Sequence, residues 1–344
     1  MSDAWRVTRG ADLRARNTFG VSARAPLLLE LDEAARLADA LAALPAGPLL
    51  VLGGGSNLLF AGDPEGAVLS LRAASLRILA EDGAYAIVRA DAGADWHGFV
   101  RWTLDHGLYG MENLALIPGT VGAAPIQNIG AYGVEVREFV HAVEALEPAT
   151  GRSRRLSRDE CALGYRDSLF KRERDRFIVT AVEFRLSRTP AVRIDYAGVR
   201  EALAADGLAA PTPARVFDAV CALRRSKLPD PAAIGNAGSF FKNPIVPLAQ
   251  AQALADAHPR LPVFPGVDER SRKLSAAWLI DACGWKGHRD GDAGVSTQHA
   301  LVLVNHGAAT GAQLLALARW IAASVSERFG VALEPEPRIV GDHW

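Results

Sequence analysis

The chain has 344 residues, of which 49% are hydrophobic and 22% charged, and this composition predicts more than one domain and a large buried core. Its 38 basic and 39 acidic residues nearly cancel, so no overall field favours nucleic acid or an anionic membrane as a partner. The 3 cysteines have no metal-binding spacing, the histidines show no metal motif, and neither an export signal nor a membrane span is recognisable, so we expect a cytoplasmic protein without a metal centre.

Hydrophobic patterns predict alternating strands and helices. Short apolar runs predict strands, in chain order, at Leu27–Leu31, Leu49–Leu52, Val68–Leu71, Ile78–Leu79, Ala86–Ala90 and Phe177–Leu186. Helical periodicity and capping residues predict helices that begin at Asp32, Asp95, Pro213, Leu248, Lys273 and Ala309, and a short one after the capping box Ser157–Glu160.

A run of glycines lies between two apolar strands at Gly53, Gly54, Gly55, Ser56 and Asn57. Glycines let backbone N–H groups approach a phosphate closely, so the run suggests a pyrophosphate cradle. A Rossmann fingerprint would need a further glycine at Leu58 and a helix after it, and no Walker motif is present. A tight hairpin without a ligand is the alternative.

The segment Met111–Gly133 is rich in glycine and alanine and poor in charge. Small residues of this kind allow the backbone to pack closely against something large and flat, which suggests a buried aromatic cofactor. A buried loop between domains is the alternative.

Ser239 lies among glycine, aromatic, cationic and amide side chains in the segment Asn236–Pro244. No nucleophile elbow surrounds it and no histidine is near it in sequence, so a proton donor is a better interpretation than a nucleophile. An isolated serine can also be a helix or turn cap.

Taken together, these segments resemble the UDP-N-acetylenolpyruvoylglucosamine reductase family over nearly the whole chain. The most specific parts of the resemblance are Ile117–Gly133, Tyr165–Lys171, Lys227–Pro231 and Asn236–Pro244. The resemblance implies an α+β protein with a two-domain FAD-binding fold of the vanillyl-alcohol-oxidase (PCMH) type and an α/β substrate-binding domain. The implied domains are residues 1–70 and 71–215 for FAD, with 325–344 returning to them, and 216–324 for the substrate.

The resemblance also implies an activity, namely NADPH-dependent reduction of UDP-N-acetylglucosamine enolpyruvate to UDP-N-acetylmuramate through noncovalent FAD, in peptidoglycan precursor synthesis. Arg166 would stabilise the developing enolate and Ser239 would deliver a proton. Glu336 would assist, although Glu334 lies two residues upstream and the Pro337 that follows Glu336 departs from the family's usual tail.

Further site residues follow from the resemblance alone. Tyr196 would cover the substrate, as in the longer class of the family. Substrate binding is implied for Tyr196, Arg224, Lys227, Asn243 and Gln298. Cofactor binding is implied for Gly53, Gly54, Gly55, Ser56, Asn57, Pro118, Gly119, Thr120, Gly122, Ala123, Gln127, Asn128, Gly130 and Ala131.

Two alternatives stay open. Another FAD-dependent oxidoreductase of the same cofactor fold would keep the glycine motifs but not the segments around Arg166 and Ser239. A flavin- or nucleotide-binding regulator without catalysis would not need those side chains.

Overall fold

The computed structural model describes residues 4–196, 198–204 and 211–344. The chain forms two compact units. The first comprises Met1–Ala11, Ala25–Gly54 and Glu65–Ser226, and the second comprises Asp12–Arg24, Gly55–Pro64 and Lys227–Trp344. The sequence predicted three parts, defined by the ligand that each would bind, whereas the two units are defined by packing. The three-part division therefore stays a prediction.

The N-terminal part of the first unit is a four-stranded sheet in the order β1-β2-β5-β3. Its elements are β1 (Trp5–Asp12), β2 (Arg24–Leu31), α1 (Leu37–Ala42), β3 (Leu49–Val51) and β5 (Ala67–Leu71). Strands β2, β5 and β3 run parallel, as expected when a helix connects β2 to β3. Leucines of β2, α1 and β5 pack together and bury a small core.

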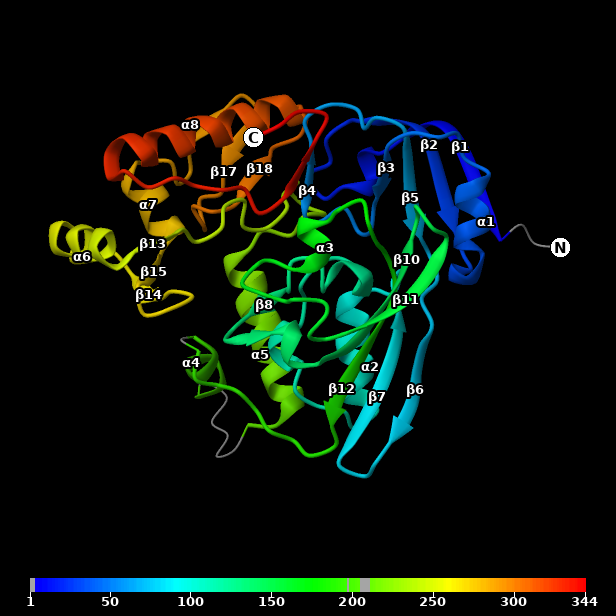
Figure 1. The fold of residues 1–344 in the computed structure, drawn as a ribbon. Helices are drawn as coiled ribbons and strands as arrows, with labels where there is room; N and C mark the ends of the chain where they lie inside the picture. Colours follow the sequence, from blue (N-terminus) through cyan, green and yellow to red (C-terminus); the bar gives the residue numbers. More distant parts are fainter. Residues whose placement is uncertain (1–3, 197, 205–210) are drawn as a thin grey trace. The chain divides into compact units, whose positions relative to one another are not determined.

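A five-stranded antiparallel sheet in the order β11-β10-β12-β7-β6 forms the rest of the first unit (Figure 1). Its strands are β6 (Leu76–Glu81), β7 (Tyr85–Asp91), β10 (Val140–Glu147), β11 (Arg152–Ser157) and β12 (Ile178–Ser187). Helices α2 (Trp96–Asp105) and α5 (Pro213–Lys227) cover one face, where Val182, Phe184 and Leu186 of β12 belong to the main core. Alternate residues of a strand point to opposite faces, so the other face is free for polar residues.

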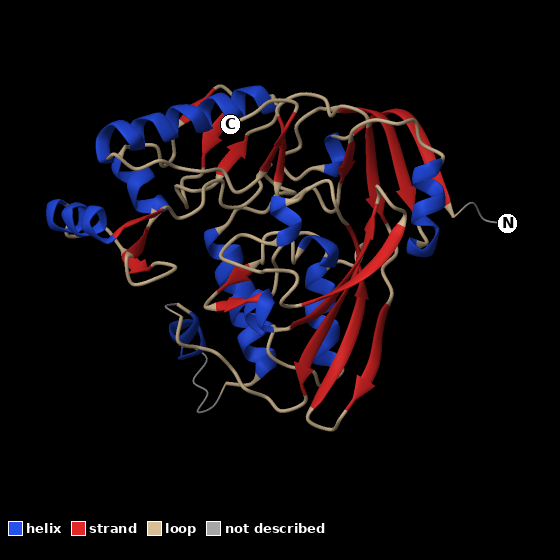
Figure 2. Cartoon of the chain, viewed as in Figure 1, coloured by secondary structure: helices blue, strands red, loops and turns tan. Residues whose placement is uncertain are grey.

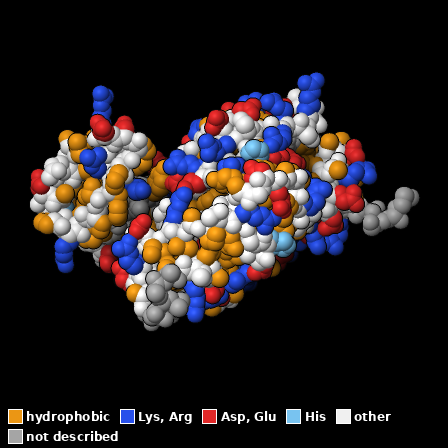
Figure 3. All heavy atoms as spheres, turned by 90° about the horizontal axis from the view of Figure 1, so that it is seen from below, with side chains coloured by type: hydrophobic (Ala, Val, Ile, Leu, Met, Phe, Trp, Pro, Cys, Tyr) orange, Lys and Arg blue, Asp and Glu red, His pale blue; other side chains and the backbone are white. Residues whose placement is uncertain are grey.

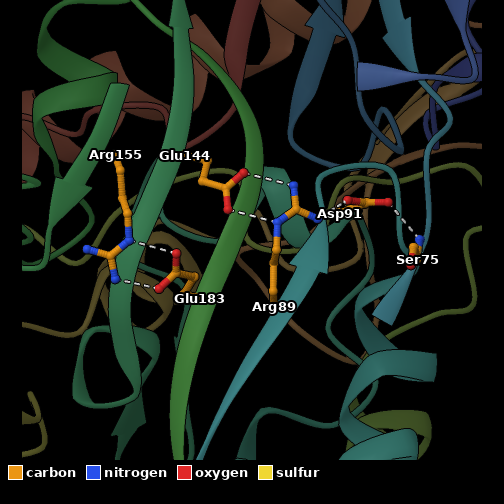
Figure 4. Close-up of polar contacts among 6 residues, drawn as sticks. All are labelled: Ser75, Arg89, Asp91, Glu144, Arg155 and Glu183. Carbon is orange, nitrogen blue, oxygen red and sulfur yellow. Dashed lines mark hydrogen bonds and ion pairs between the residues drawn. The ribbon is translucent and has the colours of Figure 1, made fainter. Parts of the chain in front are cut away.

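That other face carries a network of ion pairs across the strands (Figure 4). Arg89 of β7 donates to both oxygens of Glu144 on β10 at 2.8 Å and to Asp91 at 2.5 Å. Arg155 of β11 makes the corresponding double contact with Glu183 of β12 at 2.8 and 2.6 Å. Two-pronged guanidinium–carboxylate contacts fix direction as well as distance, so they hold the strands in register.

Short elements complete the first unit. They are β8 (Gly130–Ala131), β9 (Val134–Glu135), α3 (Leu169–Arg172) and α4 (Val199–Ala204).

The second unit combines small sheets with three helices of the described chain (Figure 2). The sheets pair β4 (Leu58–Phe60) with β19 (Arg338–Val340), β13 (Ile245–Pro247) and β14 (Val263–Pro265) with β15 (Ser271–Leu274), and β16 (Arg289–Asp290) with β17 (Ala293–Val295) and β18 (Leu303–Asn305). The helices are α6 (Leu248–Ala257), α7 (Ala276–Ala282) and α8 (Gly311–Phe329). Thr310 and Gln313 form a capping box at the start of α8, and Gly330 ends it in a left-handed conformation.

Most predicted elements are confirmed, and two are wrong. The predicted helix after Ser157 is a turn: Glu160 makes the expected contacts with Ser157, but Ala162 at φ 45° bends the chain out of a helical path. Lys273 belongs to strand β15 and not to a helix, because Ser275 caps α7 and the helix begins only at Ala276.

The surface agrees with the balanced composition. On the face drawn in Figure 3, basic and acidic side chains are interspersed. The three cysteines, Cys161, Cys221 and Cys283, are free thiols. No helix within the described residues has the length and apolar character needed to span a membrane.

Candidate active site

The glycine-rich segment begins by pairing with the loop that leads into α2. Val121 and Gly122 donate backbone hydrogen bonds to Ala94 and Ala92 at 2.9 Å, and Gly119 accepts one from Trp96 at 3.0 Å. A Cβ on Gly122 would lie 2.6 Å from the Cβ of Ala92. Only glycine therefore allows this approach, and the segment is held against the loop by backbone bonds.

Gly53 and Gly54 lie against the same segment. A Cβ on Gly54 would lie 3.0 Å from the Cα of Gly119, and a Cβ on Gly53 would lie 2.7 Å from Oγ1 of Thr120. Gly119 has a φ of 123°, a conformation open almost only to glycine. Two bare backbone segments are thus brought side by side, and their small residues fit the diphosphate of a dinucleotide cofactor.

The predicted glycine run continues into the second unit. Gly55 has a φ of 62°, and its Cβ would lie 2.0 Å from the carbonyl oxygen of Arg16, so it is required by packing. Thr18 donates to the carbonyl of Gly55 at 3.1 Å, and Asn57 accepts at its carbonyl from Arg338 at 3.0 Å. These contacts fix the backbone from which Ser56 and Asn57 project.

Further along the glycine-rich segment, Asn128 has a structural role. Its side chain is fully buried and its amide nitrogen donates to Gly164 at 2.8 Å and to Glu135 at 3.0 Å. Its amide oxygen accepts from the backbone of Arg137 at 3.0 Å. A cofactor contact from this residue would therefore come from its backbone.

Arg166 is held against the glycine-rich segment. Its guanidinium donates to the carbonyl of Gly130 at 2.9 Å and lies 3.5 Å from that of Asn128. The loop that carries it is fastened by Ser168, whose hydroxyl donates to Ile126 at 2.6 Å, and by Lys171, which donates to the carbonyl of Arg166 itself at 3.1 Å. Arg166 adopts φ 51°, so these contacts hold it in a conformation that a free chain disfavours.

Arg224 and Tyr196 also lie beside this segment in the first unit. Arg224, on α5, donates to the carbonyl of Leu116 at 3.1 Å, and burial lowers the pKa of its guanidinium. Within the described residues no carboxylate pairs with Arg224, which favours an anionic ligand as its partner. Tyr196 is half exposed and meets Tyr132 edge-on, with ring centres 5.5 Å apart.

In the second unit, Ser239 occupies the middle of three neighbouring extended segments. It bridges Val302 on one side, and the next residue, Phe240, donates to the carbonyl of Leu301 at 2.7 Å. The turn before it is fixed by Asn236, whose amide oxygen accepts from Gly238 at 3.0 Å. Among the described residues the hydroxyl of Ser239 has no hydrogen-bond partner, so its backbone is fixed while its proton is available.

The third segment carries both candidate carboxylates. Glu336 donates from its backbone to Phe240 at 2.7 Å, whereas Glu334 accepts from the backbone of Lys242 at 3.0 Å. The carboxylate of Glu334 also pairs with the ammonium group of Lys242 at 2.9 Å and is 70% exposed. Glu334 thus takes part in an ion pair at the surface, and the choice of Glu336 as the carboxylate that acts with Ser239 stays a proposal from the family resemblance.

The other predicted substrate residues of the second unit are spread along it. The amide oxygen of Asn243 accepts from Ala276 at the start of α7 at 3.0 Å. Gln298 is exposed, and its backbone donates to Ser296 at 3.1 Å. Lys227 is exposed at the end of α5.

Two residues to which the sequence analysis assigned no role support the site in the first unit, namely His97 and Asn113, the latter within the glycine-rich segment. Asn113 donates to the carbonyls of Tyr132 and Arg193, both at 2.9 Å, and so ties the loop before Tyr196 to the glycine-rich segment. His97 accepts from the backbone of Leu116 at 3.0 Å. Neither role could be read from the sequence, because the partners lie 19 or more residues away.

Comparisons with known proteins give consistent matches. A family model described as the C-terminal domain of UDP-N-acetylenolpyruvoylglucosamine reductase matches residues 230–340, and one described as an FAD binding domain matches residues 26–157. The reductase of that name from Xanthomonas euvesicatoria is 55% identical over 100% of both chains. The one from Xylella fastidiosa strain M12 is 55% identical over 99% of this chain and 97% of the relative.

The structural comparison agrees. The solved structure of UDP-N-acetylenolpyruvylglucosamine reductase (MurB) from Thermus caldophilus has a TM-score of 0.68 and 26% identity, and covers 98% of this chain and 99% of that one. Together with the FAD-binding match, this confirms the predicted fold class.

Proposed function

The chain belongs to the UDP-N-acetylenolpyruvoylglucosamine reductase family, and from this premise we propose which of its side chains perform the reaction. It is an FAD-dependent oxidoreductase that uses NADPH to reduce UDP-N-acetylglucosamine enolpyruvate to UDP-N-acetylmuramate, a peptidoglycan precursor. The FAD-binding part of the chain would hold FAD, which when bound would supply hydride transfer from NADPH to the terminal carbon of the enolpyruvyl group.

The proposed FAD site consists of the close backbone contacts around Gly53, Gly54, Gly119 and Thr120. Bare N–H groups in this cradle would bind the diphosphate, and Ile117–Gly133 would lie against the ring system. The backbone bonds to the loop before α2 keep this segment in place without the ligand.

Arg166 is the proposed electrostatic partner of the substrate carboxylate. Addition of a hydride to the enolpyruvyl double bond leaves a carbanion that the adjacent carboxylate stabilises as an enolate. A guanidinium that is already oriented stabilises this charge without reorganising. The bonds from Arg166 to Gly130 and Asn128 supply that orientation.

Ser239 is the proposed proton donor. The hydride and one proton together saturate the double bond, and the enolate is basic enough to take the proton from a well-placed hydroxyl. The observation that carries this assignment is a rigid backbone at Ser239 with a hydroxyl that has no partner among the described residues. Glu336 would assist by hydrogen bonding and help to restore the proton.

The sugar nucleotide would be bound by Tyr196, Arg224, Lys227, Asn243 and Gln298. Arg224 supports this best, because a partly buried guanidinium without a carboxylate partner in the described chain suits the diphosphate. We also propose a cytoplasmic location, which the three free thiols support.

The test separates the two half-reactions in a stopped-flow spectrometer without oxygen. Ser239→Ala should keep flavin reduction by NADPH and slow flavin reoxidation by the enolpyruvyl substrate about 10²- to 10⁴-fold, the usual contribution of a general acid. Ser187→Ala is the control, because the hydroxyl of Ser187 hydrogen-bonds to Thr189 and to no other residue in the described part of the chain. Equal losses in both half-reactions would refute the assigned role.

A matched pair of variants decides between the carboxylates. Glu336→Gln should slow reoxidation, whereas Glu334→Gln should lose only an exposed ion pair and keep near-normal rates. The reverse order would transfer the role to Glu334.

A further inference from the structure

A chain of contacts links His97 to Arg224 through one residue of the backbone. Nδ1 of His97, on α2, accepts a hydrogen bond from the N–H of Leu116 at 3.0 Å. The carbonyl of Leu116 accepts one from Nε of Arg224, on α5, at 3.1 Å. Leu116, which lies within the glycine-rich segment, thus joins the two helices.

Leu116 is held in an unusual conformation by this chain. Its φ is 57°, in the left-handed region that costs a residue with a side chain free energy. One bond fixes its N–H and the other its carbonyl, so losing either would let the backbone relax toward an ordinary conformation. Trp96 secures the same stretch by donating to the carbonyl of Leu114 at 2.9 Å.

The imidazole itself is fixed from two sides. Its ring stacks on Phe217 of α5, with centres 5.1 Å apart and an interplanar angle of 15°. Since a backbone N–H can only donate, Nδ1 must be the unprotonated nitrogen, and a doubly protonated ring could not accept this bond. The contact therefore requires neutral His97.

Charged groups on both helices face this imidazole. Asp95 and Arg101 belong to α2 and its cap, and Arg225 belongs to α5, where Asp218 pairs with Arg101 at 3.4 Å. Burial lowers the pKa of His97 most, Arg101 and Arg225 lower it further, and Asp95 opposes them. The imidazole is therefore neutral near pH 7, and it becomes protonated only at a pH below 6.5, the ordinary pKa of histidine.

We propose that His97 is a positioning residue that, through Leu116, orients Arg224 toward the diphosphate of the substrate. The inference rests on the substrate-binding role proposed for Arg224. It makes substrate affinity depend on the protonation of a residue that does not touch the substrate.

Two variants distinguish the effect of the hydrogen-bond acceptor from the effect of the titratable imidazole ring. His97→Asn keeps an acceptor oxygen near the place of Nδ1 but does not titrate, whereas His97→Leu leaves the N–H of Leu116 without a partner. We expect His97→Leu to raise KM for the enolpyruvyl substrate roughly tenfold at pH 7.5, as for a lost buried hydrogen bond, and His97→Asn to restore most of the affinity.

The decisive readout is KM for the enolpyruvyl substrate from pH 8 down to the lowest pH at which both the wild type and His97→Asn keep their flavin, with flavin content checked at each pH. We expect KM of the wild type to rise about tenfold toward acid pH relative to His97→Asn, because only the wild type loses the acceptor on protonation. Titration of the substrate itself is common to both proteins and cancels.

Parallel pH profiles for the two proteins would overturn the inference even if His97→Leu failed to fold. Arg224→Met provides the link to the proposed function, because it should raise KM at every pH. If Arg224→Met left KM unchanged, the inference would fail together with the role of Arg224, whereas parallel profiles would remove only the role of His97.

Discussion

Replacing Gly53 by alanine should weaken FAD binding through one contact. The added Cβ would lie 2.7 Å from Oγ1 of Thr120, which is 3.4 − 2.7 = 0.7 Å inside the start of ordinary contact. Gly53 does not adopt a positive φ, so alanine adds no backbone strain and the effect is due to the contact alone. Overpacking of this kind costs about 1–3 kcal/mol, which corresponds to a rise of roughly 5- to 150-fold in the Kd for FAD.

Thr120→Ala provides the matched partner of a double-mutant cycle. The remaining atoms of Thr120 lie 3.8 Å from the new Cβ, so removing Oγ1 restores ordinary contact. The double variant should therefore bind FAD as well as Thr120→Ala alone, with a favourable coupling of about 1–3 kcal/mol. Titration of the apoprotein with FAD, followed by quenching of flavin fluorescence, measures all four affinities. Additive effects would refute the geometry of the cradle.

Three further predictions concern the first unit. Arg89→Met should lower the free energy of unfolding in urea by about 3 kcal/mol, because it removes the guanidinium that pairs with the buried Asp91 and the partly buried Glu144. Asp195→Asn breaks an exposed pair with Arg200 and should change this free energy by less than about 0.5 kcal/mol. Equal effects would contradict the role of the network. Asn113→Leu should raise KM for the enolpyruvyl substrate several-fold with NADPH-dependent flavin reduction intact, since it frees the loop before Tyr196, and an unchanged KM would exclude that role. Burial raises the pKa of Glu112 above 4.5, so this acid holds its proton more tightly when folded and its contribution to stability falls as pH rises past 4.5. Glu112→Gln should flatten that part of the curve of unfolding free energy against pH, and an unaltered slope would show that another group titrates there.

Long periodic elements with clear caps were predictable from the sequence. Asp95 caps α2 as its position suggests, and the capping box of Thr310 and Gln313 begins α8. Capping residues did not predict a helix correctly where contacts elsewhere in the fold determine the path of the backbone. Ser157 makes its capping contacts without a helix, because the chain reverses at Ala162.

Strands β10 and β11 were not predicted from the sequence, because their outward residues are charged. Glu144 interrupts the apolar pattern of β10, and its partner Arg89 lies on a strand far away in sequence. A charge in such a position resembles a loop residue until the partner is known. Only the register of the sheet shows that it is paired.

The candidate site was predictable to the extent that it lies in motifs. The family resemblance placed Arg166, Ser239 and Glu336, and the residue spacing could not separate Glu336 from Glu334. Glu334 forms an ion pair with Lys242 at the surface, and the choice of Glu336 stays a proposal that the matched variants test. The roles of His97 and Asn113 had no sequence signal, although Asn113 lies in the glycine-rich segment, because both depend on backbone atoms of distant residues.

A two-step absorbance experiment on the purified holoenzyme without oxygen tests directly whether the protein reduces the enolpyruvyl substrate through its flavin. NADPH is added first and should bleach the oxidised flavin band, and the enolpyruvyl sugar nucleotide is added second. We expect the band to return and the lactyl ether to form in equal amount. A flavin that bleaches and does not recover would contradict the assigned substrate, and a protein that binds no flavin would contradict the account as a whole.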